Sequence, residues 1–117
     1  MALNQKYTHN DHIALVAPAA IVSGQAVKIG QYVGVAQTSA AVGERVTVWL
    51  NGSYLLPVTG VATEGQIVYI ADADGSLSVT ASGGFPFGVS NAAKAAAEEA
   101  ELEVAPFGMI TDTAAAA

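Results

Sequence analysis

A short pattern of residues occurs twice in this sequence, and it limits the fold more than any other feature. Gly24-Gln25-Ala26-Val27-Lys28-Ile29 returns as Gly65-Gln66-Ile67-Val68-Tyr69-Ile70. Each copy continues to a Gly-Val pair, which begins at Gly34 and again at Gly88, and then to a segment that starts with Glu and contains Val. Repeated short strands of this kind are typical of small all-β folds. We therefore predict a duplicated strand–turn–strand module, folded as a small β-barrel or β-sandwich.

The pair Asn51-Gly52 lies between two runs with strand composition, residues 45–50 and 53–58. Both runs are rich in aliphatic, β-branched and aromatic residues, and Asn-Gly favours the positive φ values of a tight type I′ turn. We therefore predict a β-hairpin that joins the two runs directly. Alternation within the first run places its valines on one face and Trp49 on the other. Pro57 cannot donate a backbone hydrogen bond, which predicts a sheet edge or a bulge there.

A second hairpin is predicted over residues 65–79. Asp72-Ala73-Asp74-Gly75 supplies turn-forming residues between two runs that contain alternating apolar positions.

Residues 91–100 differ from the rest of the chain because they are rich in Ala and Glu. That composition favours a helix, but ten residues are marginal without packing, so the segment fits either a short helix or a loop.

The length and the polarity of the ends predict the domain organisation. A chain of 117 residues suits one domain. Its beginning is polar and without a period, and its end is an Ala-rich stretch. We expect an extended N-terminal arm over residues 1–12, a single β domain over residues 13–112, and a flexible C-terminal tail over residues 113–117.

The charge balance excludes several classes of partner. The chain carries 10 acidic and 4 basic residues, and the basic ones, Lys6, Lys28, Arg45 and Lys94, are scattered. Nucleic acids and anionic membranes both require clustered Lys or Arg, so we expect neither as a partner. No apolar run approaches the roughly 20 residues of a membrane span, and the beginning lacks the plan of a signal peptide. We expect a soluble protein that is made in a cytoplasm.

The residues that carry chemistry form no convincing site. His9, Asp11 and His12 are the one cluster of metal-ligand types, but on a strand His12 points away from the other two. Asp72-Ala73-Asp74-Gly75 resembles the start of a calcium loop, yet its twelfth position is Gly83, which has no oxygen ligand to offer. The chain has no cysteine, no Gly-X-Ser-X-Gly and no phosphate-binding glycine motif. We predict no catalytic, metal or cofactor site, and no enzyme activity.

Several short motifs follow one another in an order that resembles a known family. They are Ala17-Pro18-Ala19, Ser23-Gly24-Gln25-Ala26-Val27, Gly34-Val35-Ala36, Gly43-Glu44-Arg45-Val46-Thr47-Val48, Gly65-Gln66 and Gly88-Val89. Their succession, from about Asp11 to Met109, is similar to that of the cement, or decoration, proteins of tailed-phage capsids. The Ala-rich acidic stretch at residues 92–103 departs from the family's pattern because it is longer than expected.

The resemblance implies a structural role. It implies a small tulip-like β fold that binds the outer surface of an icosahedral phage head, on the virion, and stabilises it by bridging neighbouring major capsid subunits. It also implies no cofactor and a homo-oligomer, with a trimer favoured. An extended arm can add a strand to a neighbour's sheet edge, and Trp and Tyr are frequent interface anchors. The candidate contacts to the capsid or to another subunit are therefore Leu3, Asn4, Gln5, Lys6, Tyr7, Trp49 and Tyr54.

An alternative is a small carrier or binding module of the lipoyl or biotinyl type. The Gly-Val rhythm around Lys28 resembles such domains. They present a modified Lys at the tip of a hairpin, whereas the tip predicted here is Asn51-Gly52. Trp49 and Tyr54 likewise leave two interpretations open, because aromatic residues beside a turn are either part of the core or anchors for a partner.

Overall fold

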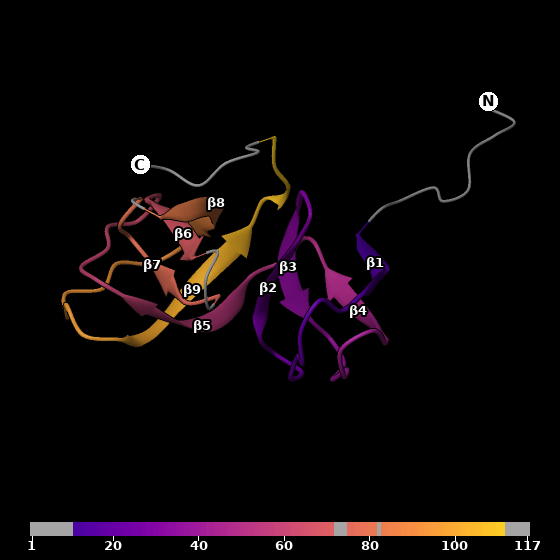
Figure 1. Cartoon of the computed structure of the whole chain (residues 1–117). Helices are drawn as coiled ribbons and strands as arrows, with labels where there is room; N and C mark the ends of the chain where they lie inside the picture. Colours follow the sequence, from indigo (N-terminus) through magenta and orange to yellow (C-terminus); the bar gives the residue numbers. More distant parts are fainter. Residues whose placement is uncertain (1–10, 72–74, 82, 112–117) are drawn as a thin grey trace, which may run out of the picture.

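In the computed structural model, the described residues are 11–71, 75–81 and 83–111, and their regular secondary structure consists of strands (Figure 1). The strands are β1 (His12–Val16), β2 (Ala26–Ile29), β3 (Tyr32–Ala36), β4 (Arg45–Trp49), β5 (Tyr54–Thr59), β6 (Ile67–Ala71), β7 (Leu77–Ser78), β8 (Gly84–Ser90), β9 (Ala100–Pro106) and β10 (Gly108–Met109). Within these ranges the structure contains no helix with the length and apolarity of a membrane span. The predicted all-β class is confirmed.

The first four strands and β10 form one sheet, which we call the open sheet. β3 lies at its centre and pairs with β2, β4 and β10, and β1 pairs with the far side of β4. All of these pairings are antiparallel. Among the described residues, β1 pairs only with β4 and β2 pairs only with β3, so both strands have an edge without a strand partner.

The remaining strands close into a barrel, which we call the closed barrel. Its order is β5-β7-β6-β8-β9, and β9 returns to pair with β5. The short strand β7 runs parallel to β5 and antiparallel to β6, and it joins them. A register shift between Val68 and Tyr69 lies opposite Pro86 in β8, where proline cannot donate to the ladder.

The predicted duplication is visible in the strand pairings. β1, β2, β3 and β4 of the open sheet correspond in order to β5, β6, β8 and β9 of the closed barrel. The two halves also share a bridge outside the strands, Ile21 with Ala40 in one and Ala62 with Lys94 in the other. The register agrees as well. Leu15 pairs with Val46 in the open sheet as Leu56 pairs with Leu102 in the closed barrel. In the same way, Val35 pairs with Trp49 and Val89 with Ala105.

Each copy of the repeat begins with the same turn. The side-chain oxygen of Gln25 accepts the backbone N–H of Val22 at 3.0 Å, and Gln66 accepts that of Thr63 at 2.9 Å. The glycine before each glutamine has a positive φ, 88° and 82°, which a residue with a side chain rarely adopts. The Gly-Gln pair therefore recurs because both residues are needed to turn the chain into the following strand.

The two halves differ at one place. Only Gly30 and Gln31 connect β2 to β3, whereas residues 72–83, which include β7, lie between β6 and β8. Because β7 pairs with both β5 and β6, it closes the second half into a barrel. The first half has no such strand among its described residues and remains an open sheet.

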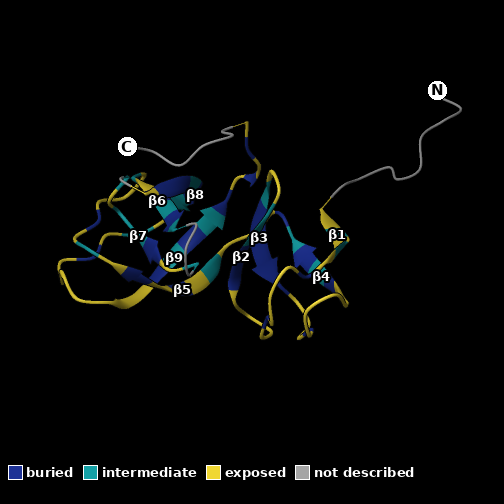
Figure 2. Ribbon diagram, viewed as in Figure 1, coloured by how far each residue is buried: buried dark blue, intermediate teal, exposed yellow. Residues whose placement is uncertain are grey.

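Buried side chains form two clusters that share β2 and β3 (Figure 2). One cluster lies under the open sheet and includes Val46 and Val48. The other fills the closed barrel around Phe87, which is fully buried, and it also takes in Val33 and Val35 from the open sheet. Val46 and Val48, which alternation places on one face of the first strand run, are both buried, as are the rings of Phe85 and Phe87.

The hairpin predicted around Asn51-Gly52 is wrong. β4 pairs with β1 and β3, β5 pairs with β7 and β9, and the Asn-Gly segment crosses from the open sheet to the closed barrel. Gly52 has a positive φ of 89°, but no non-glycine residue in the described ranges does, so the turn is not type I′. Asn51 instead donates its side-chain N–H to the Asp11 carboxylate at 2.7 Å. Both edges of β4 are occupied by strands from elsewhere in the chain, which leaves no edge for β5.

The second predicted hairpin is confirmed, since Tyr69 pairs with Ser78 and Ile70 with Leu77. Its turn residues 72–74 lie outside the described residues. Of residues 91–100, the first nine form a loop rather than a helix and Ala100 begins β9; Lys94 within the loop bridges to Ala62.

Pro57 lies where β5 is paired on one side only. β9 pairs with it there through Glu101, whereas β7 reaches β5 only at Val58 and Thr59. The edge predicted for this proline is therefore present on the β7 side.

Candidate functional site

The predicted contact residues fall into two groups. Leu3, Asn4, Gln5, Lys6 and Tyr7 lie outside the described residues, so their role stays a prediction. Trp49 and Tyr54 lie in the segment that crosses between the two sheets, one at the end of β4 and the other at the start of β5. The structure thus places these two aromatic residues at the junction of the open sheet and the closed barrel.

Trp49 is half-buried and packs beside β1. Its ring lies 4.7 Å from the ring of His12, centroid to centroid, with an angle of 35° between the planes. Its backbone pairs with His12 on one side and with Val35 on the other. The indole therefore packs against β1 and keeps part of its surface exposed, and its role as an anchor stays a prediction.

Tyr54 is half-buried against the core of the closed barrel. Its hydroxyl donates a hydrogen bond to the carbonyl oxygen of Asn51 at 2.8 Å, which holds the crossing segment in place. Burial raises the pKa of the Tyr54 hydroxyl, because ionisation in a partly apolar site is unfavourable. The side chain is therefore a neutral hydrogen-bond donor in the physiological range of pH.

Trp49 and Tyr54 line the same shallow hollow. Its other walls come from the Gly-Gln turn before β2 and from the end of β3, and the residues are Ser23, Gly24, Val35, Ala36 and Gln37. A hollow with two partly exposed aromatic rings and small side chains has the composition of a protein contact.

The basic residues within the described ranges are occupied by contacts inside the chain. The Lys28 ammonium lies 4.0 Å from the centre of the Phe85 ring. Lys94 is buried and donates to the carbonyl oxygens of Gly60, at 2.6 Å, and Ala96. Arg45 donates to the carbonyl oxygen of Ala14 at 3.3 Å. No two of these three cations share a contact partner.

Of the residues considered as metal ligands, the structure describes Asp11 and His12, and each contacts a different partner. Asp11 accepts a hydrogen bond from Asn51, and His12 stacks on Trp49. His9 lies outside the described residues, as do Asp72 and Asp74 of the calcium-like turn. Within the described ranges, no three His, Cys, Asp or Glu side chains gather to hold a metal ion.

The carrier alternative requires a lysine at the tip of a hairpin. Lys28 lies inside β2 and not at a hairpin tip, and its ammonium lies over the Phe85 ring. The Asn51-Gly52 segment connects two sheets and is no hairpin tip. The structure therefore gives neither Lys28 nor the Asn51-Gly52 segment the hairpin-tip position that a carrier domain uses.

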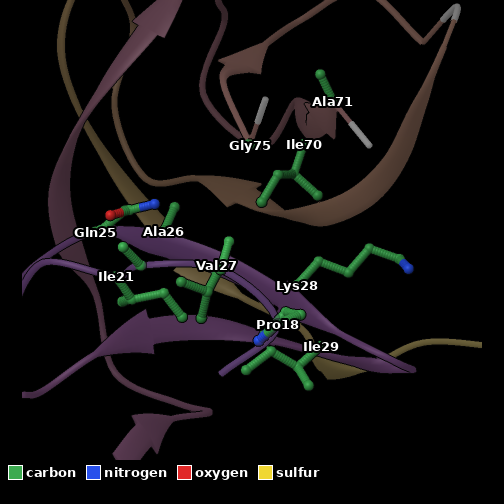
Figure 3. Close-up of a pocket in the computed structure, with 12 residues that line it drawn as sticks. Pro18, Ile21, Gln25, Ala26, Val27, Lys28, Ile29, Ile70, Ala71 and Gly75 are labelled. Carbon is green, nitrogen blue, oxygen red and sulfur yellow. The ribbon is translucent and has the colours of Figure 1, made fainter. Parts of the chain in front are cut away.

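A second hollow was not predicted. It is a cavity of ≈ 270 Å³ along the open edge of β2 (Figure 3). One wall is the segment after β1, from Pro18 to Ile21, and another is β2 itself with Val27 and Ile29. The end of β6 and Gly75 lie across from them. The signal for this cavity was present in the repeat, because the second copy has additional residues where the first has only a short turn.

The comparisons with known proteins agree with the resemblance. A family model described as a phage cement protein matches residues 7–117, nearly the whole chain. No curated protein and no solved structure matches this chain. Because the family model covers far more than half of the sequence, the chain belongs to the phage cement protein family.

Proposed function

We propose that this protein is a capsid decoration protein that binds the outer surface of an icosahedral phage head and bridges neighbouring major capsid subunits. The observation that carries the proposal is the family match over residues 7–117. The protein is made in the cytoplasm of the host and ends on the virion. It acts as a structural component and not as an enzyme.

The chemistry of the surface supports this role. Only 12% of the residues are charged, well below the roughly 25% that is usual for a soluble domain. Several large aliphatic side chains are exposed, among them Val22 at 65%, Val42 at 67% and Leu55 at 66%. A weakly charged surface with exposed aliphatic groups suits a protein that is covered by a partner when it works.

We place the contacts to the shell at the hollow of Trp49 and Tyr54, and we assign the arm residues Leu3 to Tyr7 to contacts with the shell or with another subunit. Partly exposed aromatic rings gain most from burial in an interface. Each contact needs little affinity if the protein is a homo-oligomer, with a trimer favoured, because several linked sites bind together at a high effective concentration.

The test is co-sedimentation of the purified protein with phage shells that lack their own decoration protein. We expect saturable, stoichiometric binding, and a loss of binding of at least tenfold for Trp49→Ala. Ile67→Ala is the matched control, because Ile67 is also a partly exposed apolar residue, at 41%, but lies outside the hollow. A native far-UV spectrum for both variants establishes that they fold.

Two results would contradict the proposal in different ways. A folded wild-type protein that does not sediment with shells would refute the cement role. Binding that survives Trp49→Ala but is lost for Ile67→Ala would retain the role and move the contact to another face. The arm is tested in the same assay by deleting residues 1–10.

A further inference from the structure

Among the described residues, the open sheet has no counterpart of β7, which leaves one strand position without a strand. In the closed barrel, β7 pairs with Val58 and Thr59 of β5 and with Tyr69 and Ile70 of β6. Within the described ranges, no strand lies at the corresponding place between the end of β1 and β2. The residues that correspond to the β7 partners are Ala17, Pro18, Lys28 and Ile29.

The vacant position coincides with the cavity along β2. Pro18, Lys28 and Ile29, three of the four corresponding residues, line it (Figure 3). Ile21 and Val27, which are both 5% exposed, also line it. The place that Leu77 fills in the closed barrel, where it is 4% exposed, is thus an apolar groove in the open sheet.

The backbone of β2 offers hydrogen bonds to this groove. Ile29 and Tyr32 flank the two-residue turn between β2 and β3, so they form a hydrogen-bonded pair. Hydrogen-bonded residues alternate along an antiparallel ladder, which leaves the N–H and C=O of Lys28 facing away from β3. The corresponding residue in the barrel, Tyr69, pairs with Ser78 of β7. Lys28 is therefore positioned to pair with an added strand.

We propose that the first residues of a second copy of this chain add to the groove as a strand, with Leu3 in the place that corresponds to Leu77. The added strand runs parallel to β1 and antiparallel to β2, as β7 does to β5 and β6. Ser76-Leu77-Ser78 presents one large aliphatic residue between two small polar ones. Ala2-Leu3-Asn4 presents a large aliphatic residue between small ones in the same way. Strand addition of this kind obtains affinity from backbone hydrogen bonds and specificity from one side-chain pocket.

A second copy is the better source of this strand than the same chain. Two parallel strands that follow one another in a chain need a crossover of about a dozen residues, and fewer residues than that lie between Leu3 and β1. Residues 112–117 are one Asp, one Thr and four Ala, so none of them offers a large apolar side chain for the pocket. A second copy can place Leu3 in the groove without a crossover, and identical copies can exchange arms reciprocally.

The first test is the mass of the pure protein by light scattering over a range of concentration. Lys28→Pro removes the backbone N–H that faces the groove while β2 retains its pairing with β3, since proline is tolerated on an edge strand in that orientation. We expect an oligomer for the full chain, and a dissociation constant at least tenfold weaker for Lys28→Pro and for Leu3→Asp. Lys28→Ala is the matched control, because it also loses the contact with Phe85 but keeps the N–H. It should assemble like the wild type.

The second test does not depend on how the proline variant folds. A synthetic peptide of residues 1–10 is added to protein that lacks those residues, and amide hydrogen exchange is followed. We expect the peptide to slow the exchange of the Lys28 backbone amide. A scrambled peptide, or a peptide in which Leu3 is replaced by Asp, should leave that exchange unchanged. Oligomers that survive deletion of residues 1–10, or a peptide that leaves exchange at Lys28 unchanged, would overturn the inference. Protection of Lys28 only on phage shells would overturn it too, and would identify a shell segment as the occupant.

These tests use purified protein alone, so they do not depend on the cement role. A protein that exchanges arms but ignores shells would refute the proposed function and leave this inference intact. A monomer that binds shells while its Lys28 amide stays exposed would refute this inference and leave the proposed function intact.

Discussion

Gly88 and Gly34 occupy corresponding positions in the two halves, and replacing either with alanine should destabilise the protein strongly. A Cβ at Gly88 would lie 2.2 Å from the carbonyl oxygen of Ala105, and a Cβ at Gly34 would lie 2.2 Å from that of Trp49. Contacts of this kind below 3.0 Å are essentially never observed. Each substitution must therefore push two paired strands apart, β8 from β9 or β3 from β4.

The expected loss is about 3 kcal/mol of unfolding free energy for each variant. Overpacking that shifts the backbone costs about 1–3 kcal/mol, and each weakened ladder hydrogen bond adds about 1 kcal/mol. Gly43→Ala is the reference, because Gly43 has a positive φ of 86° but open space around its Cβ position. Gly43→Ala should lower the unfolding free energy by only about 1–2 kcal/mol, which is the cost of a left-handed conformation for alanine.

Urea unfolding followed by the fluorescence of Trp49, the one tryptophan of the chain, measures the difference. With a slope of about 2 kcal/mol per molar urea, a loss of 3 kcal/mol lowers the midpoint by about 1.5 M. Since β2 and β3 contribute to both buried clusters, we also expect one transition in each variant, as a single domain requires. A midpoint for Gly88→Ala no lower than that of Gly43→Ala would refute the clash argument, and two separate transitions would refute the single domain.

Two further predictions concern polar groups. The Ser53 hydroxyl and then the Asn91 amide donate to the Glu103 carboxylate, at 2.8 and 3.3 Å, and these bonds lower its pKa. Because the pKa of Glu103 is lower in the folded than in the unfolded state, its ionised form stabilises the fold at any pH above the unfolded-state pKa, and this stabilisation is lost as the pH falls through the folded-state pKa. The urea midpoint of Glu103→Gln should therefore lie below the wild-type midpoint at pH 7 and converge with it in acid. A difference between the two midpoints that does not change with pH would contradict this. Lys94→Met keeps the aliphatic stem but leaves the Gly60 carbonyl without its charged donor, so we expect the free energy of unfolding to fall by about 2 kcal/mol, measured by thermal or urea unfolding. A fall below about 0.5 kcal/mol would show that water replaces the ammonium.

Local features of the fold were predictable from the sequence. The two Gly-Gln turns are set by a glycine that accepts positive φ and a glutamine that caps the preceding backbone, and both interactions lie within a few residues. The inward faces of β4 and β9 follow from alternation, because successive side chains on a strand point to opposite sides. The order of weak motifs was enough to indicate the cement family, which the family match confirms.

The site was only partly predictable. Trp49 and Tyr54 were identified by residue type beside a turn, and the structure brings them into one hollow. The groove along β2 was missed, because a vacant strand position becomes visible only by comparison with the half in which β7 fills it. The repeat indicated where the two halves differ, but not that the additional residues close a barrel.

The sequence by itself determined where this chain forms strands, where it turns and which side chains face inward, since backbone preferences and alternation act over a few residues. Only the tertiary structure decided which strands pair. Asn51-Gly52 has the composition of a hairpin turn, yet β4 pairs with β1 and β3 while β5 pairs with β9 and β7. A strand edge accepts any strand with free backbone groups, so the partner is chosen by the burial that the whole chain achieves. Here that choice buries the apolar faces of both copies and leaves β1 and β2 with an edge open to a further strand.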